Sequence, residues 1–160
     1  MMTITYKQIT EKELSKYESL MLPMIYEELE QQASIEEEYI AIAAEEEDEP
    51  LGVLVAEFED SGDINLLSIW TTQDRRREGI ASGLFDKMAE IARALYEWDD
   101  GQYGDDINVK TMYCLDDRYR EIFEAWLEKN HFTDFMVMRD ATKDRPDICG
   151  ATAEIHFYRW

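Results

Sequence analysis

The sequence predicts an α+β fold, an α/β three-layer arrangement in which helices cover both faces of a mixed, mostly antiparallel sheet. Three observations predict it. Short apolar runs joined by polar, turn-rich segments are typical of an antiparallel meander. One long segment changes to a three- and four-residue apolar period, which indicates an amphipathic helix. A strand–helix–strand unit beside the meander implies a mixed sheet with covered faces.

The first half of the chain is predicted as a strand, two short helices and a three-strand meander. Thr3–Ile9 alternates as a strand does. Pro23 separates two helical segments, because proline ends or restarts a helix. Residues 45–50 and 60–63 are expected to be the turns of the meander. The ranges are helices at Glu11–Leu20 and Met24–Gln32, then strands at Glu38–Ala44, Leu51–Glu59 and Ile64–Thr71.

The second half is predicted as two helices and three strands. Apolar residues mark one face of the first, long helix: Ile80, Leu84, Met88, Ile91 and Leu95. Asp116 and Asp117 are candidate N-caps of the second helix. The ranges are a strand at Ile107–Cys114, a helix at Arg118–Asn130, and strands at Phe132–Arg139 and Thr152–Trp160. The predicted order is β-αα-βββ-α-β-α-ββ. If the last strand lies at a sheet edge, it can pair with a second chain, and a homodimer is then expected.

Length and composition indicate one globular domain over residues 1–160, or one half of a tandem protein. The 45% of hydrophobic residues can form a proper core. A net charge of −21 repels nucleic acid and anionic lipid, so neither is an expected partner. The sequence has no membrane-length apolar run, and its first residues lack the apolar stretch of a signal peptide, so neither a membrane span nor a signal peptide is expected. Cys114 and Cys149 have no metal-ligand spacing, and we expect thiols of a cytoplasmic protein without a metal.

A basic island interrupts this acidic sequence. Arg75, Arg76 and Arg77 stand side by side, and Gly79 follows directly before the long helix. Glycine lets a ligand approach the backbone, and a helix N-terminus presents unpaired N–H groups with a partial positive charge. Arginines beside such a terminus form an anion site that suits phosphate. A plain solvated loop is the alternative interpretation.

The island fits the motif Gln/Arg-x-x-Gly-x-Gly/Ala as Arg76-Arg77-Glu78-Gly79-Ile80-Ala81. With this motif and the element order, the chain resembles the GNAT superfamily of acyl-CoA-dependent N-acetyltransferases. The resemblance implies that acetyl-CoA is the co-substrate. It also implies that main-chain N–H groups surround the CoA pyrophosphate, those of Arg77, Gly79, Ala81 and Ser82. The main chain of Ile69 and Thr71 would then bind the pantetheine arm.

The catalytic half of the family pattern is degenerate in this chain. The position of the family's carboxylate base, eleven residues before Arg76, is Asn65. Asp63 lies two residues earlier and is the candidate base, although a turn residue is an equal interpretation. The position of the family's tyrosine acid is Leu127, and His131 replaces the usual glycine. Tyr119 is therefore a candidate proton donor, with Tyr113 and Cys114 as further ones.

The acceptor is expected to be a cationic amine, such as a polyamine, an aminoglycoside or a protein lysine or N-terminus. Glu27, Glu28 and Glu30 lie in the segment that forms one wall of the acceptor cleft in this family, and Glu36–Glu38 follow. A solvated acidic face that maintains solubility is the alternative. Because Asn65 and Leu127 occupy usual catalytic positions, a catalytically silent module that binds acyl-CoA or a protein remains a second hypothesis.

Overall fold

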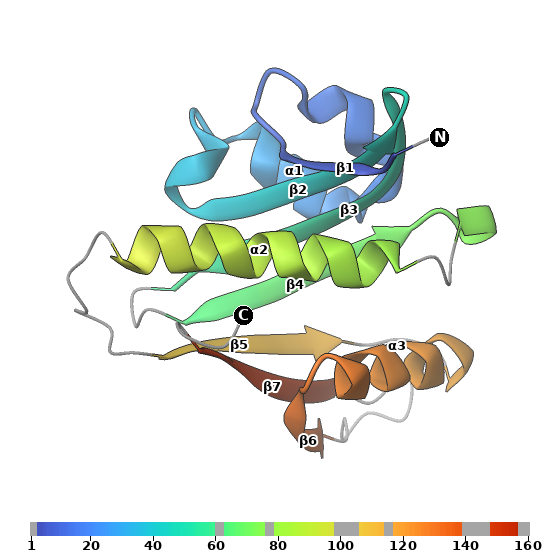
Figure 1. The fold of residues 1–160 in the computed structure, drawn as a ribbon, viewed down its shortest axis with the longest axis vertical. Helices are drawn as coiled ribbons and strands as arrows, with labels where there is room; N and C mark the ends of the chain where they lie inside the picture. Colours follow the sequence, from blue (N-terminus) through green and yellow to red (C-terminus); the bar gives the residue numbers. More distant parts are fainter. Residues whose placement is uncertain are drawn as a thin grey trace.

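The computed structural model describes residues 3–59, 63–75, 79–97, 106–113, 117–138 and 148–156. Within these ranges the strands form one seven-stranded sheet with helices on both faces (Figure 1). The strands are β1 (Thr5–Gln8), β2 (Tyr39–Glu46), β3 (Glu49–Phe58), β4 (Ile64–Thr71), β5 (Asp106–Tyr113), β6 (Thr133–Met138) and β7 (Ile148–His156). The α-helices are α1 (Pro23–Glu30), α2 (Ile80–Glu97) and α3 (Asp117–Lys129), and the 3-10 helices are η1 (Leu14–Leu20), η2 (Ile35–Glu37) and η3 (Gln73–Arg75). The predicted fold class and element order are confirmed.

The sheet is mixed, as predicted. Its strand order is β1-β2-β3-β4-β5-β7-β6. The pairing of β4 with β5 is parallel, whereas the other neighbouring strands pair antiparallel. Helix α2 lies in the connection from β4 to β5, and a crossover of this kind is what parallel strands require.

The last strand lies inside the sheet, so its predicted edge position is wrong. Strand β7 begins at Ile148 and not at Thr152, and it pairs with both β5 and β6. The small residues Gly150 and Ala151 resemble a turn in the sequence, but both pair with β5, and Gly150 also pairs with β6, so they lie in an extended strand. Among the described strands the edges are β1 and β6, and the expectation of a homodimer loses its argument from the last strand.

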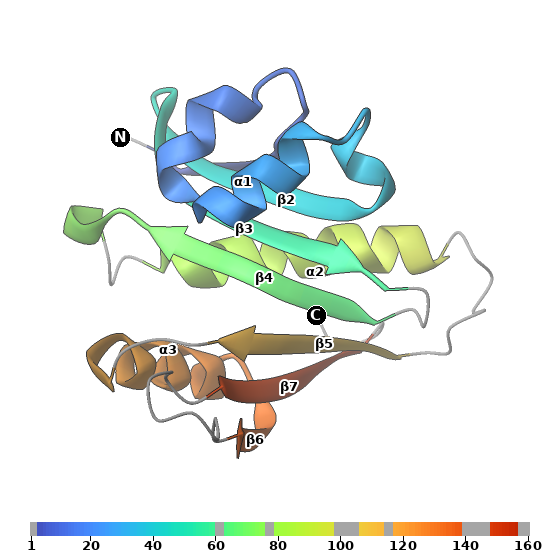
Figure 2. The same ribbon diagram turned by 180° about the vertical axis from the view of Figure 1, so that it is seen from behind.

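Two hydrophobic cores lie on the two faces of the sheet. On one face α2 and α3 cover residues that include Ile64 and Leu66 of β4 (Figure 1). On the other face η1, α1 and η2 cover Val53 and Val55 of β3 (Figure 2). Successive residues of a strand point to opposite faces, so the continuous apolar run of β3 serves both cores.

The apolar stripe predicted for the long helix faces the first core over most of its length. Ile80, Leu84 and Met88 are buried, and Ile91 packs against the same core. Leu95 is exposed near the carboxyl end of α2. The stripe therefore ends one turn earlier than the sequence pattern predicts.

The first predicted helix is a 3-10 helix. Its buried residues Leu14, Tyr17 and Leu20 are spaced by three. A 3-10 helix has three residues per turn, so this spacing places all of them on one face, whereas an α-helix would spread them. The local period therefore explains why η1 packs on the sheet in this form.

The turn between β2 and β3 is shorter than predicted. Only Glu47 and Asp48 lie outside the strands, and both have positive φ, 52° and 66°. Positive φ at both central residues is typical of the two-residue type I′ hairpin turn, whose twist matches the strands. The two strands continue to Glu46 and from Glu49, which brings Glu46 into a regular strand.

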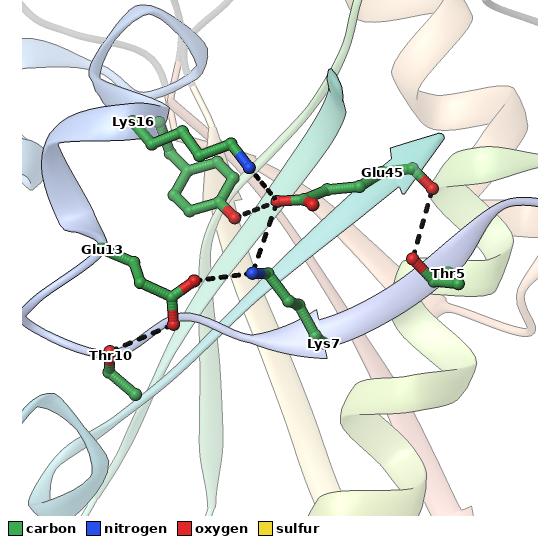
Figure 3. Close-up of polar contacts among 7 residues, drawn as sticks. Thr5, Lys7, Thr10, Glu13, Lys16 and Glu45 are labelled. Carbon is green, nitrogen blue, oxygen red and sulfur yellow. Dashed lines mark hydrogen bonds and ion pairs between the residues drawn. The ribbon is translucent and has the colours of Figure 1, made fainter. Parts of the chain in front are cut away.

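A buried carboxylate ties β2 to the N-terminal segment. Glu45 is 4% exposed, and its carboxylate accepts a hydrogen bond from the Tyr17 hydroxyl (Figure 3). The same carboxylate lies 3.1 Å from Lys16 Nζ and 3.7 Å from Lys7 Nζ. Burial opposes ionisation, but Tyr17, Lys16 and Lys7 together outweigh it and lower the pKa of Glu45.

Helix α3 ends in a Schellman turn that holds His131 in a left-handed conformation. His131 has a φ of 68°. The N–H of Phe132 donates to the carbonyl of Leu127 at 2.9 Å, and the N–H of His131 donates to Glu128 at 3.1 Å. This is the hydrogen-bond pattern in which glycine is the preferred residue.

Candidate functional site

Strands β4 and β5 pair over a short stretch and then separate. Their parallel register covers Ile64–Leu66 of β4 and Val109–Thr111 of β5, yet β4 continues to Thr71. Figures 1 and 2 both show the two strands diverging toward their carboxyl ends. A bulge accompanies the separation, because Val55 pairs with Ser68 and Ala56 with Leu66, which leaves Leu67 as an extra residue.

Beyond the bulge, every second residue of β4 directs its main-chain N–H and C=O groups toward β5 and away from β3. The N–H of Thr72 donates to the carbonyl of Leu51, on the β3 side, at 2.8 Å. A Cβ added at Gly52 of β3 would lie 2.8 Å from the carbonyl oxygen of Trp70, so that carbonyl also faces β3. Main-chain direction alternates along an antiparallel strand. The N–H and C=O groups of Ile69 and Thr71 therefore point toward the β5 side, where the strands diverge.

Helix α2 begins at the predicted anion-binding residues. Gly79 has a φ of 78°, and its carbonyl accepts a hydrogen bond from the N–H of Gly83 at 2.9 Å. Gly79 therefore caps the helix, and Ala81 and Ser82 lie in its first turn, where N–H groups have no partner within the helix. Arg76, Arg77 and Glu78 lie outside the described residues.

Arg75, the first arginine of the island, is held by a carboxylate. Its Nη2 lies 2.9 Å from Oε2 of Glu46, and its Nη1 lies 3.2 Å from Oε1 of the same residue. The hydrogen bonds from Arg75 lower the pKa of Glu46. The forked end of Arg75 is thus engaged by the protein, and its predicted contact with a cofactor remains a prediction.

The described part of the loop fits a phosphate-bearing cofactor such as CoA. No described atom lies within 4 Å of the position that a Cβ of Gly79 would occupy. The hydroxyl oxygen of Thr72 is buried and has no hydrogen-bond partner among the described residues. The space beside Gly79 lies at a helix N-terminus, and the buried Thr72 hydroxyl, close to it in sequence, can donate a hydrogen bond. Both features suit an anionic group that accepts hydrogen bonds.

The two candidate bases lie in different surroundings. Asn65 donates from Nδ2 to Oε1 of Glu57, its cross-strand neighbour, at 3.1 Å. Asp63 precedes the amino end of β4, and its Oδ2 lies 3.5 Å from Lys110 Nζ. Lys110 also donates to Glu59 at 2.8 Å. Asp63 is therefore at the end of β4 opposite to the one that diverges from β5.

The structure does not test the candidate proton donors. Tyr119 lies in α3, but its side chain is outside the described part, as are the side chain of Tyr113 and all of Cys114. Leu127 is fully buried in the core beneath α2 and α3. An aliphatic side chain in the core cannot protonate a leaving group, so the family's usual acid is absent from this position.

Sequence reasoning missed a polar row that crosses four strands. Tyr39, Glu57, Asn65 and Lys110 are successive cross-strand partners from β2 to β5. Their shared register places them on the face that η1 and α1 cover, since Tyr39 belongs to that core. The sequence pattern that could have predicted this row is the alternation of side chains along β3, which puts Glu57 on the same face as Val55.

Tyr39 connects this row to α1. Its hydroxyl donates to Oε1 of Glu28 at 3.2 Å. Burial, reinforced by the negative charge of Glu28, its hydrogen bond, and the charges of Glu57 and Glu38, raises the pKa of Tyr39 to about 12. The negative potential of three carboxylates therefore converges on this hydroxyl. Among the described residues no lysine or arginine forms an ion pair with Glu28 or Glu57.

The described residues contain no group of three or more His, Cys, Asp or Glu side chains that could hold a metal ion. The helices described in the structure include none that is long and apolar enough to span a membrane.

The chain matches the sequence profile of the Acetyltransferase (GNAT) family over residues 6–102. It therefore belongs to that family, which uses acetyl-CoA, and it is an acyl-CoA N-acyltransferase of the GNAT type. No curated protein sequence matches the chain.

Solved structures support the same fold. The ribosomal-protein-S18-alanine N-acetyltransferase from Escherichia coli is 12% identical, with a TM-score of 0.70 over 96% of this chain and 95% of that one. Ard1 from Thermoplasma volcanium is 13% identical, with a TM-score of 0.68 over 95% and 97%. An aminoglycoside 6'-N-acetyltransferase complexed with coenzyme A is 17% identical, with a TM-score of 0.65 over 94% and 97%.

Proposed function

We propose that this enzyme transfers an acetyl group from acetyl-CoA directly to a primary amine of a cationic acceptor, a small molecule or a protein lysine or N-terminus. The observation that carries the proposal is the divergence of β4 from β5 after the bulge at Leu67, with the start of α2 beyond it. An extended pantetheine arm can pair with β4 on the side that diverges from β5, while its pyrophosphate meets the helix N-terminus.

In this arrangement the chain's own groups bind and orient the cofactor. The main chain of Ile69 and Thr71 would hydrogen-bond the pantetheine amides. The N–H groups of Gly79, Ala81 and Ser82, with those of the arginine island at Arg76 and Arg77, would hold the pyrophosphate. When bound, acetyl-CoA supplies the thioester that is the acetyl donor.

The transfer needs a neutral amine. Its nitrogen attacks the thioester carbonyl carbon, the C–S bond breaks, and the thiolate takes up a proton. We assign the proton acceptor to Glu57, because Asn65 orients its carboxylate near the bulge, on the face of the sheet that η1 and α1 cover. Asp63 is the alternative, and its ion pair with Lys110 at the far end of β4 disfavours it.

The charge around this row supports a cationic acceptor. Glu28 and Glu57 lack ion-pair partners among the described residues, and the whole chain carries −21. A carboxylate-rich wall attracts and holds ammonium groups. Two proteins of the same fold are named for substrates with more than one amine: the aminoglycoside 6'-N-acetyltransferase and a diaminobutyrate acetyltransferase.

The test has two stages. Acetyl-CoA that binds the native state must raise the melting temperature, and by mass action the stabilisation grows with the logarithm of one plus its concentration divided by Kd. Free-thiol release is then measured against polyamines, aminoglycosides, lysine peptides and a neutral amine as control. Turnover above the background without amine, strongest for cationic amines, is the expected result. No thermal shift at millimolar acetyl-CoA would overturn the cofactor assignment, and binding without turnover for any amine would favour the silent module.

A further inference from the structure

Glu46 and Arg75 form a two-pronged ion pair beside the proposed acyl-CoA site. The two nitrogen–oxygen distances are 2.9 and 3.2 Å. Most of both side chains is shielded from solvent, with 25% of Arg75 and 16% of Glu46 exposed. A bidentate arginine–carboxylate pair fixes the orientation of both groups as well as their separation.

This pair joins a rigid strand to the segment that leads into α2. Glu46 is the last residue of β2, whose other residues are buried. Arg75 ends η3, whose main chain is also tied down. The N–H of Arg75 donates to the carbonyl of Thr72 at 3.0 Å, and the N–H of Thr72 donates to Leu51 at 2.8 Å. Contacts with β2 and β3 thus fix the chain from the end of β4 to Arg75.

We propose that Glu46 is a positioning residue for acyl-CoA binding, which acts by holding Arg75 and thereby the segment from the end of β4 to Arg75. This inference rests on the proposed function, since it concerns the same cofactor site. In this proposal the guanidinium of Arg75 stabilises the loop, and residues that follow Arg75 in the chain contact the phosphates.

A positioning role of Glu46 and simple electrostatics predict opposite changes in CoA affinity when the carboxylate is removed. CoA is anionic, so removing a nearby carboxylate in a chain of charge −21 should by itself tighten binding. It should also free Arg75 to contact a phosphate. If Glu46 instead positions the loop, its removal weakens binding. The low pKa that Arg75 imposes on Glu46 keeps the carboxylate ionised at neutral pH, where the test is done.

The experiment measures the Kd of CoA by calorimetry and the KM and kcat of acetyl transfer. The variants are Glu46→Gln, Arg75→Lys and the matched control Glu49→Gln, an exposed carboxylate at the start of β3. We expect Glu46→Gln to raise the Kd and the KM for acetyl-CoA by about tenfold with little change in kcat, because a misplaced binding group costs up to ~100-fold. Arg75→Lys keeps the charge but loses the fork, and should behave like Glu46→Gln. Glu49→Gln should leave the Kd of CoA unchanged or lower it slightly.

A charge reversal supplies the rescue test. The double variant Glu46→Arg with Arg75→Glu should bind CoA more tightly than either single reversal, because it restores the pair with its partners exchanged. Tighter binding by Glu46→Gln, or an unchanged Kd for Arg75→Lys, would overturn the proposal and assign Arg75 to direct phosphate contact.

Amide hydrogen exchange of residues 72–75 gives a readout that needs no cofactor. Faster exchange in Glu46→Gln than in Glu49→Gln is expected, and equal exchange would overturn the positioning role. If the wild-type protein fails to bind CoA, the proposed function fails, and the exchange comparison still decides whether Glu46 holds the loop.

Discussion

The amide nitrogen of Asn65 donates a hydrogen bond to a carboxylate oxygen of Glu57, 3.1 Å away across the pairing of β3 with β4. The carboxamide of Asn65 thus occupies the β4 position where the family usually has its carboxylate base, and the carboxylate of Glu57 lies on the neighbouring strand β3. The pair lies next to the bulge at Leu67, where β4 begins to separate from β5.

Glu57→Gln should lower turnover on the order of 100-fold while leaving acetyl-CoA binding intact, because a positioned proton acceptor contributes at least that factor. Glutamine still accepts the hydrogen bond from Asn65, so the fold should be retained. Steady-state kinetics and a CoA titration check both parts. Asp63→Asn is the matched comparison: a large loss of turnover there, with Glu57→Gln unaffected, would transfer the role to Asp63.

Gly52→Ala should loosen both the fold and the cofactor site. The added Cβ would lie 2.8 Å from the main-chain oxygen of Trp70 and 3.2 Å from a side-chain carbon of Ile80. Overpacking of this kind costs about 1–3 kcal/mol. Because β4 must shift between Ile69 and Thr71, the Kd of CoA should also rise. Urea unfolding and calorimetry test this, and normal stability with normal binding would show that the two strands can separate locally without effect.

His131→Gly should stabilise the protein by roughly 1 kcal/mol, the cost of a left-handed conformation for a residue with a Cβ. The reason is the φ of 68° at the end of α3. Urea unfolding measures the gain. His131→Ala removes the imidazole but keeps the Cβ, so it should gain nothing. Equal stabilisation by both variants would mean that the imidazole, and not the backbone, is responsible.

Glu45→Gln should reduce the free energy of unfolding at pH 7 by about 2 kcal/mol, the range for hydrogen bonds to a charged group. The folded-state pKa of Glu45 is lowered from its ordinary value of 4.5, so its ionisation contributes stability above that pH. The contribution is lost as the pH falls through the folded pKa. The difference between wild type and variant should therefore narrow below pH 4.5.

Urea unfolding from pH 3 to 7 follows this difference, with Glu36→Gln, an exposed carboxylate on η2, as the control. The control should track the wild type at every pH. A gap between wild type and Glu45→Gln that stays constant down to pH 3 would contradict the account of Glu45.

Local patterns were sufficient to predict the elements. Ile64–Thr71 was predicted to the residue, because a strand between a glycine-containing turn and a basic loop has clear ends. The start of α2 at Ile80 follows from Gly79 and the apolar period behind it. Where the local signal was ambiguous, the prediction failed: the small residues at the start of β7 and the acidic hairpin of Glu47 and Asp48 resemble longer loops.

The element order, the family resemblance and the cofactor motif could be predicted from the amino-acid sequence, because each depends on neighbours along the chain. The carboxylate beside Asn65, the carboxylate that holds Arg75 and the strands at the edges of the sheet became known only from the fold. Those facts depend on strand register and packing, which join residues of different elements: Glu46 and Arg75 are 29 positions apart, and Glu57 and Asn65 lie on neighbouring strands. No local pattern encodes such a contact, since a shift of one residue in register would turn either side chain to the opposite face.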